Sequence, residues 1–440
     1  MLSNKLYPRK ILNTLLNWLS EPQIIILVGS RQVGKTCLLH LIIEELKRKG
    51  LPSSCIHFFN LENPVIFNIL NLGPIEFINY LKAHGVDITQ PNYIFIDEIQ
   101  YLENPSNFLK FLFDEYKSLK IIATGSSTLS IKQKFKDSLA GRKQVFELHP
   151  LSFQEFLWFK GVSRLAEVLS ENSLCKFISE PQKISLQTLK HLTTELIPFF
   201  NEYCLFGGYP AITLQPDPQK KILMLLEIYN SYIRKDIKDL MQIENITAFN
   251  NLMQLLALQI GNLFNYNTIG QHLGIARETL QKYLLLLENT FIIKTIPPYF
   301  TNKRKEITKM PKFYFYDIGL RNTILENFQP LNFRADSGAL MENVVLAQLI
   351  KTLKPLSKIN FWRSISKNEV DFVTTEDGIL TPLEVKYQSF KNPHLSTGLK
   401  AFIRLYKPKT AFVLTKDYLA KTIFENTPIW FLPPWFIASD

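Results

Sequence analysis

The sequence predicts an α/β protein that begins with a parallel β-sheet and crossover helices and ends with a second α/β domain. Short apolar runs alternate with helical stretches over residues 1–150, which is the pattern of such a sheet. A loop containing two glycines follows the first apolar run and leads directly into an apolar helix. Residues 330–440 mix helices with several strands after a long helical region, so more than one domain is expected.

The elements of the first domain follow one another as alternating helices and strands. Apolar residues at helical spacing over 11–19 predict a helix before the first strand. Helices are also expected at 36–48 and 107–117. The apolar runs that predict strands are 23–28, 54–59, 93–96, 120–124 and 144–148.

Four regions are predicted along the chain. The first is the sheet domain, the second is helical, the third has the order of a winged helix-turn-helix, and the fourth is the second α/β domain. Their predicted bounds are 1–150, 151–245, 246–325 and 330–440.

Composition narrows the class of protein. With 46% apolar and 20% charged residues among 440, the chain has material for several cores and is not mainly disordered. Its 50 Lys and Arg exceed its 39 Asp and Glu, and the net charge of +11 favours an acidic partner such as nucleic acid or a nucleotide. Four scattered cysteines without CxxC spacing, no apolar run of membrane-spanning length and no signal peptide lead us to expect a cytoplasmic chain without membrane association.

The loop after the first strand matches G-x-x-x-x-G-K-[ST], the Walker A pattern. Glycines let successive backbone N–H groups point at phosphate oxygens, and the following helix adds its positive N-terminal end. The lysine is expected to reach the β and γ phosphates of ATP, and the final hydroxyl to ligate Mg²⁺. The predicted phosphate-binding residues are Gly29, Ser30, Arg31, Gln32, Val33, Gly34, Lys35 and Thr36.

The apolar run 93–96 is followed directly by Asp97 and Glu98. At the carboxyl end of a strand beside the phosphate loop, Asp97 is expected to hold Mg²⁺, directly or through water. Glu98 is then the group that polarises the attacking water. Taken alone, four apolar residues before two acids also fit a surface turn.

Two further residues are candidates for contact with the γ-phosphate. Ser126 follows the strand at 120–124, where a hydroxyl can sense that phosphate; an ordinary turn between strand and loop is the alternative. Arg142 precedes the strand at 144–148 and offers a fixed cationic fork for the transition state, either in its own chain or in a neighbouring copy. A surface salt bridge is an equal alternative for Arg142.

These motifs together resemble a family of bacterial and archaeal AAA-type ATPases in which the ATPase core is joined to a C-terminal domain of uncertain function. The resemblance covers nearly the whole chain and implies a P-loop NTPase sheet that binds and hydrolyses ATP with Mg²⁺. It carries over Lys35, Thr36, Asp97 and Glu98 position by position. The segments that resemble the family are 29–36, 95–100, 124–127, 139–142, 150–156, 206–210 and 232–237.

Residues 268–316 have the order helix, tight turn, helix and hairpin, which is the winged helix-turn-helix arrangement. The predicted hairpin carries basic residues, which suit DNA phosphates. Winged helices attached to ATPases also serve as lids or protein contacts, so a DNA partner and a protein partner both stay open. The predicted basic residues of the hairpin are Lys303, Arg304, Lys305, Lys309 and Lys312.

The last region carries a possible second site. If Asp377 and Gly378 form a two-residue hairpin turn, paired residue numbers sum to 755 and Asp371 lies opposite Glu384. Facing carboxylates repel, and a divalent cation between them would remove that cost. Lys386, two residues after Glu384, shares its face, and Glu342 adds a carboxylate from a helix.

This Glu…Asp-x(12)-Glu-x-Lys pattern resembles the PD-(D/E)xK nucleases, with Glu342, Asp371 and Glu384 as metal ligands and Lys386 as the nuclease lysine. The alternative is that Lys386 pairs with Glu369 and Asp371 caps a turn.

Two functions follow from the whole sequence. The first is an ATPase whose nucleotide state repositions a winged helix and a nuclease-like domain on DNA. The second is a nucleotide-dependent regulatory switch without nuclease activity that recognises a protein partner. A homo-oligomer is compatible with both.

Overall fold

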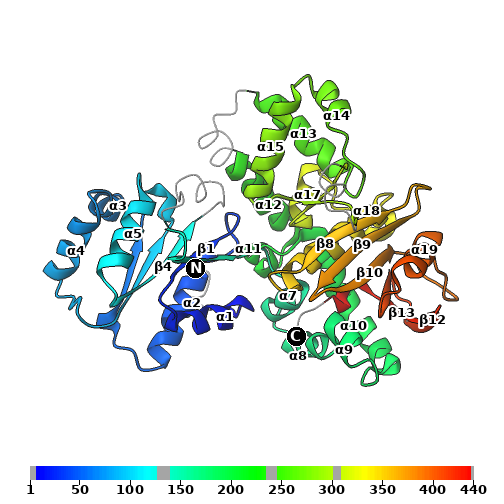
Figure 1. Cartoon of the computed structure of the whole chain (residues 1–440), viewed down its shortest axis with the longest axis horizontal. Helices are drawn as coiled ribbons and strands as arrows, with labels where there is room; N and C mark the ends of the chain where they lie inside the picture. The colour runs from blue at the N-terminus through cyan, green and yellow to red at the C-terminus, as the bar shows by residue number, and fades with distance from the viewer. Residues whose placement is uncertain (1–5, 126–138, 234–244, 301–308, 438–440) are drawn as a thin grey trace. The chain divides into compact units, whose positions relative to one another are not determined.

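The computed structural model divides into two compact units, and each is described by itself (Figure 1). The first unit comprises Met1–His149 with Asn289–Phe291, and the second comprises Pro150–Glu288 and Ile292–Asp440. The residues that the structure describes are 6–125, 139–233, 245–300 and 309–437. The unit boundary falls between residues 149 and 150, and the finer division into four regions stays a prediction.

The first unit is built on a parallel five-stranded sheet of order β2-β3-β4-β1-β5, which confirms the predicted α/β class. Its strands are β1 (Ile24–Val28), β2 (Ile56–Asn60), β3 (Asn92–Asp97), β4 (Leu119–Gly125) and β5 (Lys143–Glu147). Its helices and short 3-10 turns are α1 (Ile11–Asn17), η1 (Trp18–Ser20), α2 (Lys35–Arg48), η2 (Ser53–Cys55), α3 (Pro64–Asn71), α4 (Pro74–Ala83), η3 (Ile99–Tyr101) and α5 (Pro105–Glu115).

The direction of the strands decides which residues can meet. Strand β1 lies between β4 and β5 and is buried along its whole length, as an apolar central strand should be. Val28 pairs with Gly125 of β4 and with Glu147 of β5, and Ile96 of β3 pairs with Ala123. The carboxyl ends of β1, β3 and β4 therefore share one edge, and residues that precede a strand lie at the opposite edge.

The second unit begins with helices, as predicted for 151–245. They are α7 (Phe153–Phe159), α8 (Ser163–Glu171), α9 (Leu174–Ser179), α10 (Leu186–Phe206), α11 (Pro210–Leu214) and α12 (Pro218–Tyr232). The Gly207–Gly208 turn after α10 packs closely on Asp317, whose carboxylate accepts the Gly208 N–H at 2.7 Å and the Leu320 N–H at 3.1 Å. A side chain on Gly207 would collide with that carboxylate.

The next elements follow the predicted order of helices and a hairpin. They are α13 (Ile246–Leu258), α14 (Tyr266–Leu273), α15 (Arg277–Asn289), β6 (Ile293–Ile296), β7 (Lys312–Phe315) and α17 (Ile318–Ile324). Gly274 ends α14 in the left-handed conformation, with φ of 63°, which explains the glycine in the tight turn. Strands β6 and β7 pair antiparallel. Whether this region acts as a winged helix stays a prediction.

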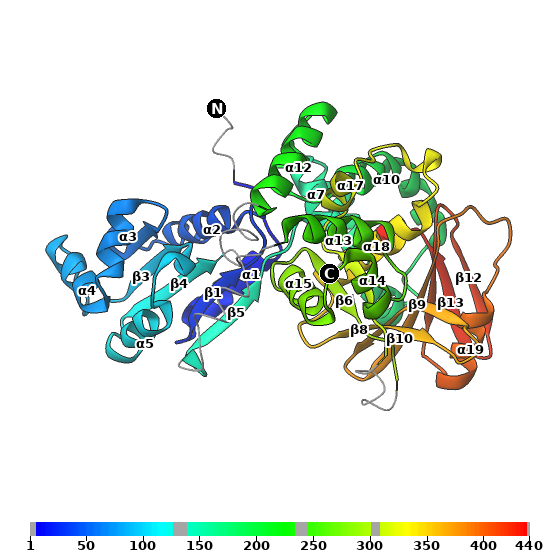
Figure 2. The ribbon, with the colours of Figure 1, turned by 90° about the horizontal axis from the view of Figure 1, so that it is seen from above.

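A six-stranded mixed sheet, of order β12-β13-β11-β10-β9-β8, forms the last part of the second unit (Figure 2). Its elements are α18 (Ser337–Thr352), β8 (Lys358–Arg363), β9 (Glu369–Glu376), β10 (Ile379–Lys386), α19 (Thr397–Tyr406), β11 (Ala411–Thr415), β12 (Ala420–Phe424) and β13 (Thr427–Leu432), with turns η6 (Leu331–Phe333) and η7 (Pro434–Phe436). Asp377 and Gly378 turn with φ of 50° and 80°, and the register from Ile379–Glu376 to Leu383–Phe372 is the predicted one.

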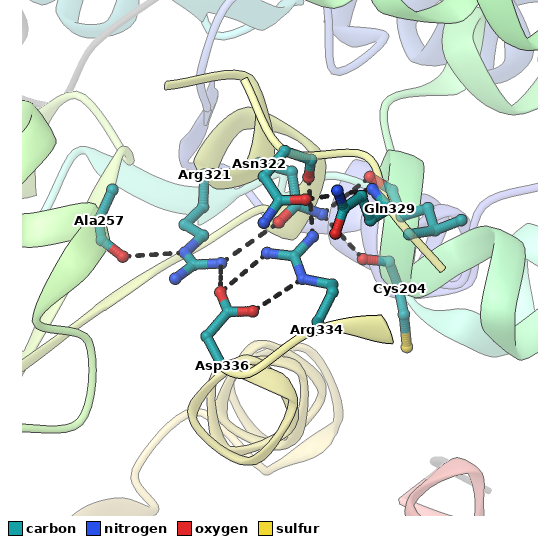
Figure 3. A network of polar contacts seen from close by, with 9 residues as sticks. Cys204, Ala257, Arg321, Asn322, Gln329, Arg334 and Asp336 are labelled. Carbon is teal, nitrogen blue, oxygen red and sulfur yellow. Dashed lines mark hydrogen bonds and ion pairs between the residues drawn. The ribbon is translucent and has the colours of Figure 1, made fainter. Parts of the chain in front are cut away.

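A buried polar network joins the helices of the second unit (Figure 3). Arg321 of α17 donates to the Ala257 carbonyl at the end of α13 at 2.9 Å and to Asp336 at 2.5 Å. Arg334 makes a two-pronged contact with the same carboxylate, 2.8 Å at each oxygen. The hydrogen bond from Arg334 and the one from Arg321 hold the pKa of Asp336 well below its usual range. The network therefore ties α13 and α17 to the start of α18.

A candidate nucleotide site and an acidic cluster

The phosphate loop has the curled backbone that its glycines predict. Gln32 and Gly34 are left-handed, with φ of 62° and 94°, and α2 begins at Lys35 directly after that turn. Gly29 approaches the Leu148 carbonyl so closely that a Cβ there would overlap it. The loop is thus fixed between the end of β1 and the residue that follows β5.

The Lys35 ammonium lies inside this curl. It donates to the carbonyl oxygens of Gly29 and Ser30, each at 3.1 Å, and the residue is buried. Within the described part of the chain, the buried Ser30 hydroxyl has no hydrogen-bond partner. A buried cation that donates to carbonyl oxygens, beside an unsatisfied hydroxyl, is suited to an anionic group in the loop.

The predicted Mg²⁺ ligands lie together. The Thr36 hydroxyl donates to one oxygen of the buried Asp97 carboxylate at 2.7 Å. Both are hard oxygen ligands of the kind that Mg²⁺ binds, so the residues present fit the ion. The structure therefore brings together the loop and the end of β3, two segments about 60 residues apart in the sequence.

Thr124 of β4 is a functional candidate that the sequence reasoning missed. Its buried hydroxyl donates to the other Asp97 oxygen and accepts the Glu98 backbone N–H at 3.0 Å. Glu98 is left-handed, with φ of 59°, and its carboxylate accepts from the Gln100 side chain. Thr124 thus fixes both acids at the strand ends. The predicted sensor Ser126 lies outside the described residues.

Arg9 links the phosphate loop to the residues after β5 through hydrogen bonds. Its guanidinium donates to the Val33 carbonyl in the loop at 2.8 Å and to the His149 carbonyl after β5 at 2.7 Å. The residue is buried, and both acceptors are backbone oxygens. Because Arg9 precedes the loop by about two dozen residues, no local pattern pointed to it.

We expect Arg9→Met to raise the KM for ATP about tenfold with a smaller effect on kcat, because the Val33 carbonyl of the loop and the His149 carbonyl after β5 lose their donor. Steady-state ATPase kinetics and thermal unfolding of the same samples measure this. Arg48→Met, an equal change at an exposed position of α2, is the matched control. An unchanged KM in a folded Arg9→Met protein would remove Arg9 from the account.

Arg142 lies at the wrong edge of the sheet to serve the phosphate loop of its own chain. Its carbonyl accepts the Ile24 N–H at 2.8 Å, at the amino end of β1, whereas the loop follows the carboxyl end. The length of β1 separates them, about 16 Å for five residues. Its side chain instead makes a two-pronged contact with Asp114, at 2.8 and 3.2 Å, as in the surface salt-bridge alternative. A role toward a neighbouring copy stays a prediction.

In the second unit, the paired residues of β9 and β10 end at Leu383–Phe372, next to Asp371 and Glu384. These two acids use their carboxylates differently. Asp371 accepts the Val385 backbone N–H at 2.7 Å, across the hairpin. Glu384 pairs with Lys386 at 3.2 Å and accepts from the Ser396 hydroxyl at 2.9 Å. The predicted shared face of Glu384 and Lys386 is therefore found. The alternative pair Lys386–Glu369 is not, since Glu369 pairs with Lys312 and Arg363.

Glu342 of α18 completes an acidic cluster, which we define as Glu342, Glu369, Asp371 and Glu384. Tyr314 of β7 donates to Glu342 at 3.3 Å. Burial, and then the charge of Asp371, raises the pKa of Glu342 to about 8. Burial also raises the pKa of Asp371, although the Val385 amide, Lys312 and Lys386 favour its charged form. The members of the acidic cluster come from α18, β9 and β10 of the second unit.

The acidic cluster is not arranged as a metal site. Among the described residues, no group of three or more His, Cys, Asp or Glu side chains is placed to hold a metal ion. The predicted ligands Glu342, Asp371 and Glu384 are bonded instead to a tyrosine, a backbone amide and a lysine. Lys312, expected on the hairpin surface as a phosphate contact, is 2% exposed and bound to Glu369, which corrects that expectation.

We expect the metal-free protein to lose stability as pH rises from 5 to 9 because of Glu342. Its folded pKa of about 8 lies above the unfolded value, so the folded state holds a proton that unfolding releases, and this favours folding only at lower pH. Chemical unfolding in chelator should show Glu342→Gln losing less over this range, by on the order of 3 kcal/mol. Glu171→Gln, an exposed glutamate, is the control, and identical pH profiles would contradict the assignment.

Three family models match separate parts of the chain. The model of the AAA domain matches residues 21–157, which include the phosphate loop, Asp97 and Glu98. Two models described as domains of unknown function match residues 197–331 (DUF8612) and 337–433 (DUF4143). With the parallel sheet, the first match is consistent with a P-loop NTPase core of the AAA type.

The relatives in sequence are uncharacterised proteins. One from Haemophilus influenzae is 22% identical over 94% of this chain and 94% of its own. One from Methanocaldococcus jannaschii is 28% identical over 79% of this chain and 71% of its own. Both alignments extend well beyond residues 21–157, so the similarity is not confined to the part that matches the AAA domain.

Among solved structures, a Walker-type ATPase of Pyrococcus abyssi aligns with a TM-score of 0.42 and 15% identity, over 73% of this chain and 97% of that one. Cdc6p of Pyrobaculum aerophilum aligns with a TM-score of 0.31 and 14% identity, over 74% and 96%. Within the described residues, no helix is long and apolar enough to cross a membrane.

Proposed function

We propose that this protein binds ATP with Mg²⁺ and hydrolyses it. The observation that carries the proposal is the joining of the phosphate loop to the acids of β3 through the Thr36–Asp97 hydrogen bond. The buried Lys35 ammonium and the unpartnered Ser30 hydroxyl in the described chain support an anionic ligand in the loop. The match of residues 21–157 to the AAA domain supports the same activity.

Each residue of the nucleotide site has a separate role in ATP hydrolysis. Thr36 and Asp97 hold Mg²⁺, which when bound neutralises negative charge on the phosphates. Lys35 exchanges its contacts with the Gly29 and Ser30 carbonyls for phosphate oxygens. The backbone amides of the loop bind the remaining oxygens of the triphosphate. Glu98 accepts a proton from the attacking water, and Thr124 and Gln100 hold it in position.

The finer proposal is that the ATPase acts with DNA through the 246–325 region and a nuclease-like C-terminal domain. The net charge of +11 and the helix-and-hairpin order of α13 to β7 support a DNA partner. The Glu384–Lys386 pair beside Asp371, on the hairpin of β9 and β10, supports the nuclease-like domain. The phosphodiester-cleaving role of Lys386 is part of this proposal.

ATP turnover with and without DNA tests the proposed partner. We expect duplex DNA to stimulate turnover severalfold in the wild type at low salt and to have no effect on Lys35→Ala. Stimulation should fade as salt rises, because phosphate contacts release counterions. A rate of ATP turnover that is the same with and without DNA at every salt concentration would favour the alternative, a nucleotide-dependent switch with a protein partner.

Plasmid incubated with Mg²⁺ or Mn²⁺ tests the nuclease-like centre separately. Cleavage that disappears in Asp371→Ala but survives in Lys35→Ala would support an active centre in the C-terminal domain. Cleavage that persists in Asp371→Ala would exclude the assignment. A chain that hydrolyses ATP but leaves plasmid intact keeps the first proposal and rejects cleavage under these conditions.

A further inference from the structure

The acidic cluster receives a cation from a different region of the second unit. Lys312 begins β7 in the 246–325 region, whereas all four carboxyl groups belong to residues 342–384. The Lys312 ammonium pairs with Glu369 and lies 5.1 Å from the centre of the Phe361 ring on β8. A charged amine that is only 2% exposed is costly to bury unless it is paired. The ion pair with Glu369 offsets that cost.

The backbone around Lys312 holds it in place. The residue pairs with Ile296 in β6, and it also forms a bridge to Leu263. Asn343 of α18 bonds both backbone groups of Phe315, accepting at 2.7 Å and donating at 2.8 Å. These contacts fix the hairpin against the helix that carries Glu342, so Lys312 cannot leave without moving β7.

Lys312 also acts on the carboxyl groups that it does not touch. Its charge favours the ionised forms of both Glu342 and Asp371. With Lys386 on Glu384 and Arg363 on Glu369, the described residues place three cations around four carboxyl groups. Little negative charge is left to attract a divalent ion.

We propose that Lys312 is a resident cation of the acidic cluster, which keeps divalent metal ions out while β7 is docked. This inference rests on the proposed nuclease-like centre and concerns how that centre is regulated. The Lys312 ammonium, which belongs to the 246–325 region, blocks the centre. Metal ions gain access only when Lys312 is withdrawn or removed. The same arrangement explains why no metal-holding group is found among the described residues.

Equilibrium Mn²⁺ binding to the nucleotide-free full chain tests this proposal, with free Mn²⁺ followed by electron paramagnetic resonance. We expect Lys312→Met to bind one Mn²⁺ at least tenfold more tightly than the wild type. The double variant Lys312→Met, Asp371→Asn should lose this gain, because the ion sits on the acidic cluster. Lys358→Met, the same charge change at an exposed position, should behave like the wild type, and so should Lys312→Arg.

Two results would overturn the proposal. One is a folded Lys312→Met that binds Mn²⁺ no better than the wild type, with Lys312→Gln as the second variant should the methionine form not fold. The other is a wild type that already binds Mn²⁺ tightly through Asp371, which would leave the nuclease-like centre standing and remove Lys312 from it. The ATPase proposal is judged independently by turnover, since Lys312 and the phosphate loop belong to different units.

Discussion

Lys35→Ala is expected to weaken ATP binding by about 100-fold or more and to reduce turnover below detection. The physical reason is that the ammonium is the cation of the loop, buried and held by two loop carbonyls that a phosphate would replace. Charge-assisted contacts in such a site contribute about 3 kcal/mol or more. Calorimetric titration with Mg²⁺–ATP and a phosphate-release assay measure the two effects.

The control for this variant is Lys47→Ala, an exposed lysine at the other end of the same helix α2 that pairs only with Glu44 among the contacts described. It should bind and hydrolyse ATP like the wild type. Unchanged binding by a folded Lys35→Ala protein would mean that the nucleotide does not occupy the loop at 29–36.

Glu98→Gln is expected to keep ATP affinity within a few-fold while lowering kcat by about 100- to 1,000-fold. The amide has the size of the carboxylate but cannot accept a proton from water. The Glu98 backbone N–H donates to the Thr124 hydroxyl, and this hydrogen bond does not use the Glu98 side chain. The end of the strand should therefore keep its geometry in this variant. Single-turnover hydrolysis separates this loss of chemistry from any change in binding.

Glu103→Gln, an exposed glutamate just beyond the same strand, controls for the loss of a negative charge. Turnover that survives in Glu98→Gln would show that another group handles the proton. A large loss of affinity would instead show that Glu98 helps to hold the loop or the ion.

The parts of the site that lie within one motif could be predicted from the sequence. The phosphate loop follows a strand and opens a helix, so its curl is dictated by Gly34 and its neighbours. The sequence predicts Asp97 beside it because both lie at the carboxyl ends of parallel strands, and the Thr36–Asp97 contact agrees with that prediction. The Asp377–Gly378 turn fixed the hairpin register by the same kind of local rule.

The contacts that sequence reasoning missed join distant segments. Arg9 reaches Val33 and His149, and Lys312 reaches Glu369, through packing that no local spacing encodes. Arg142 is different, because its position was predictable: a residue that precedes a parallel strand lies at the amino edge, away from the loop. Thr124, the last β4 hydroxyl among the described residues, was likewise within reach of the strand-end rule.

Hydrogen–deuterium exchange with and without Mg²⁺–ATP is the most direct test of the central claim that the backbone of 29–36 binds the phosphates. We predict that ATP protects peptides covering this loop and those covering Asp97 and Glu98, and that the protection is absent in Lys35→Ala. Unprotected loop amides at saturating ATP, or protection confined to other segments, would contradict the account.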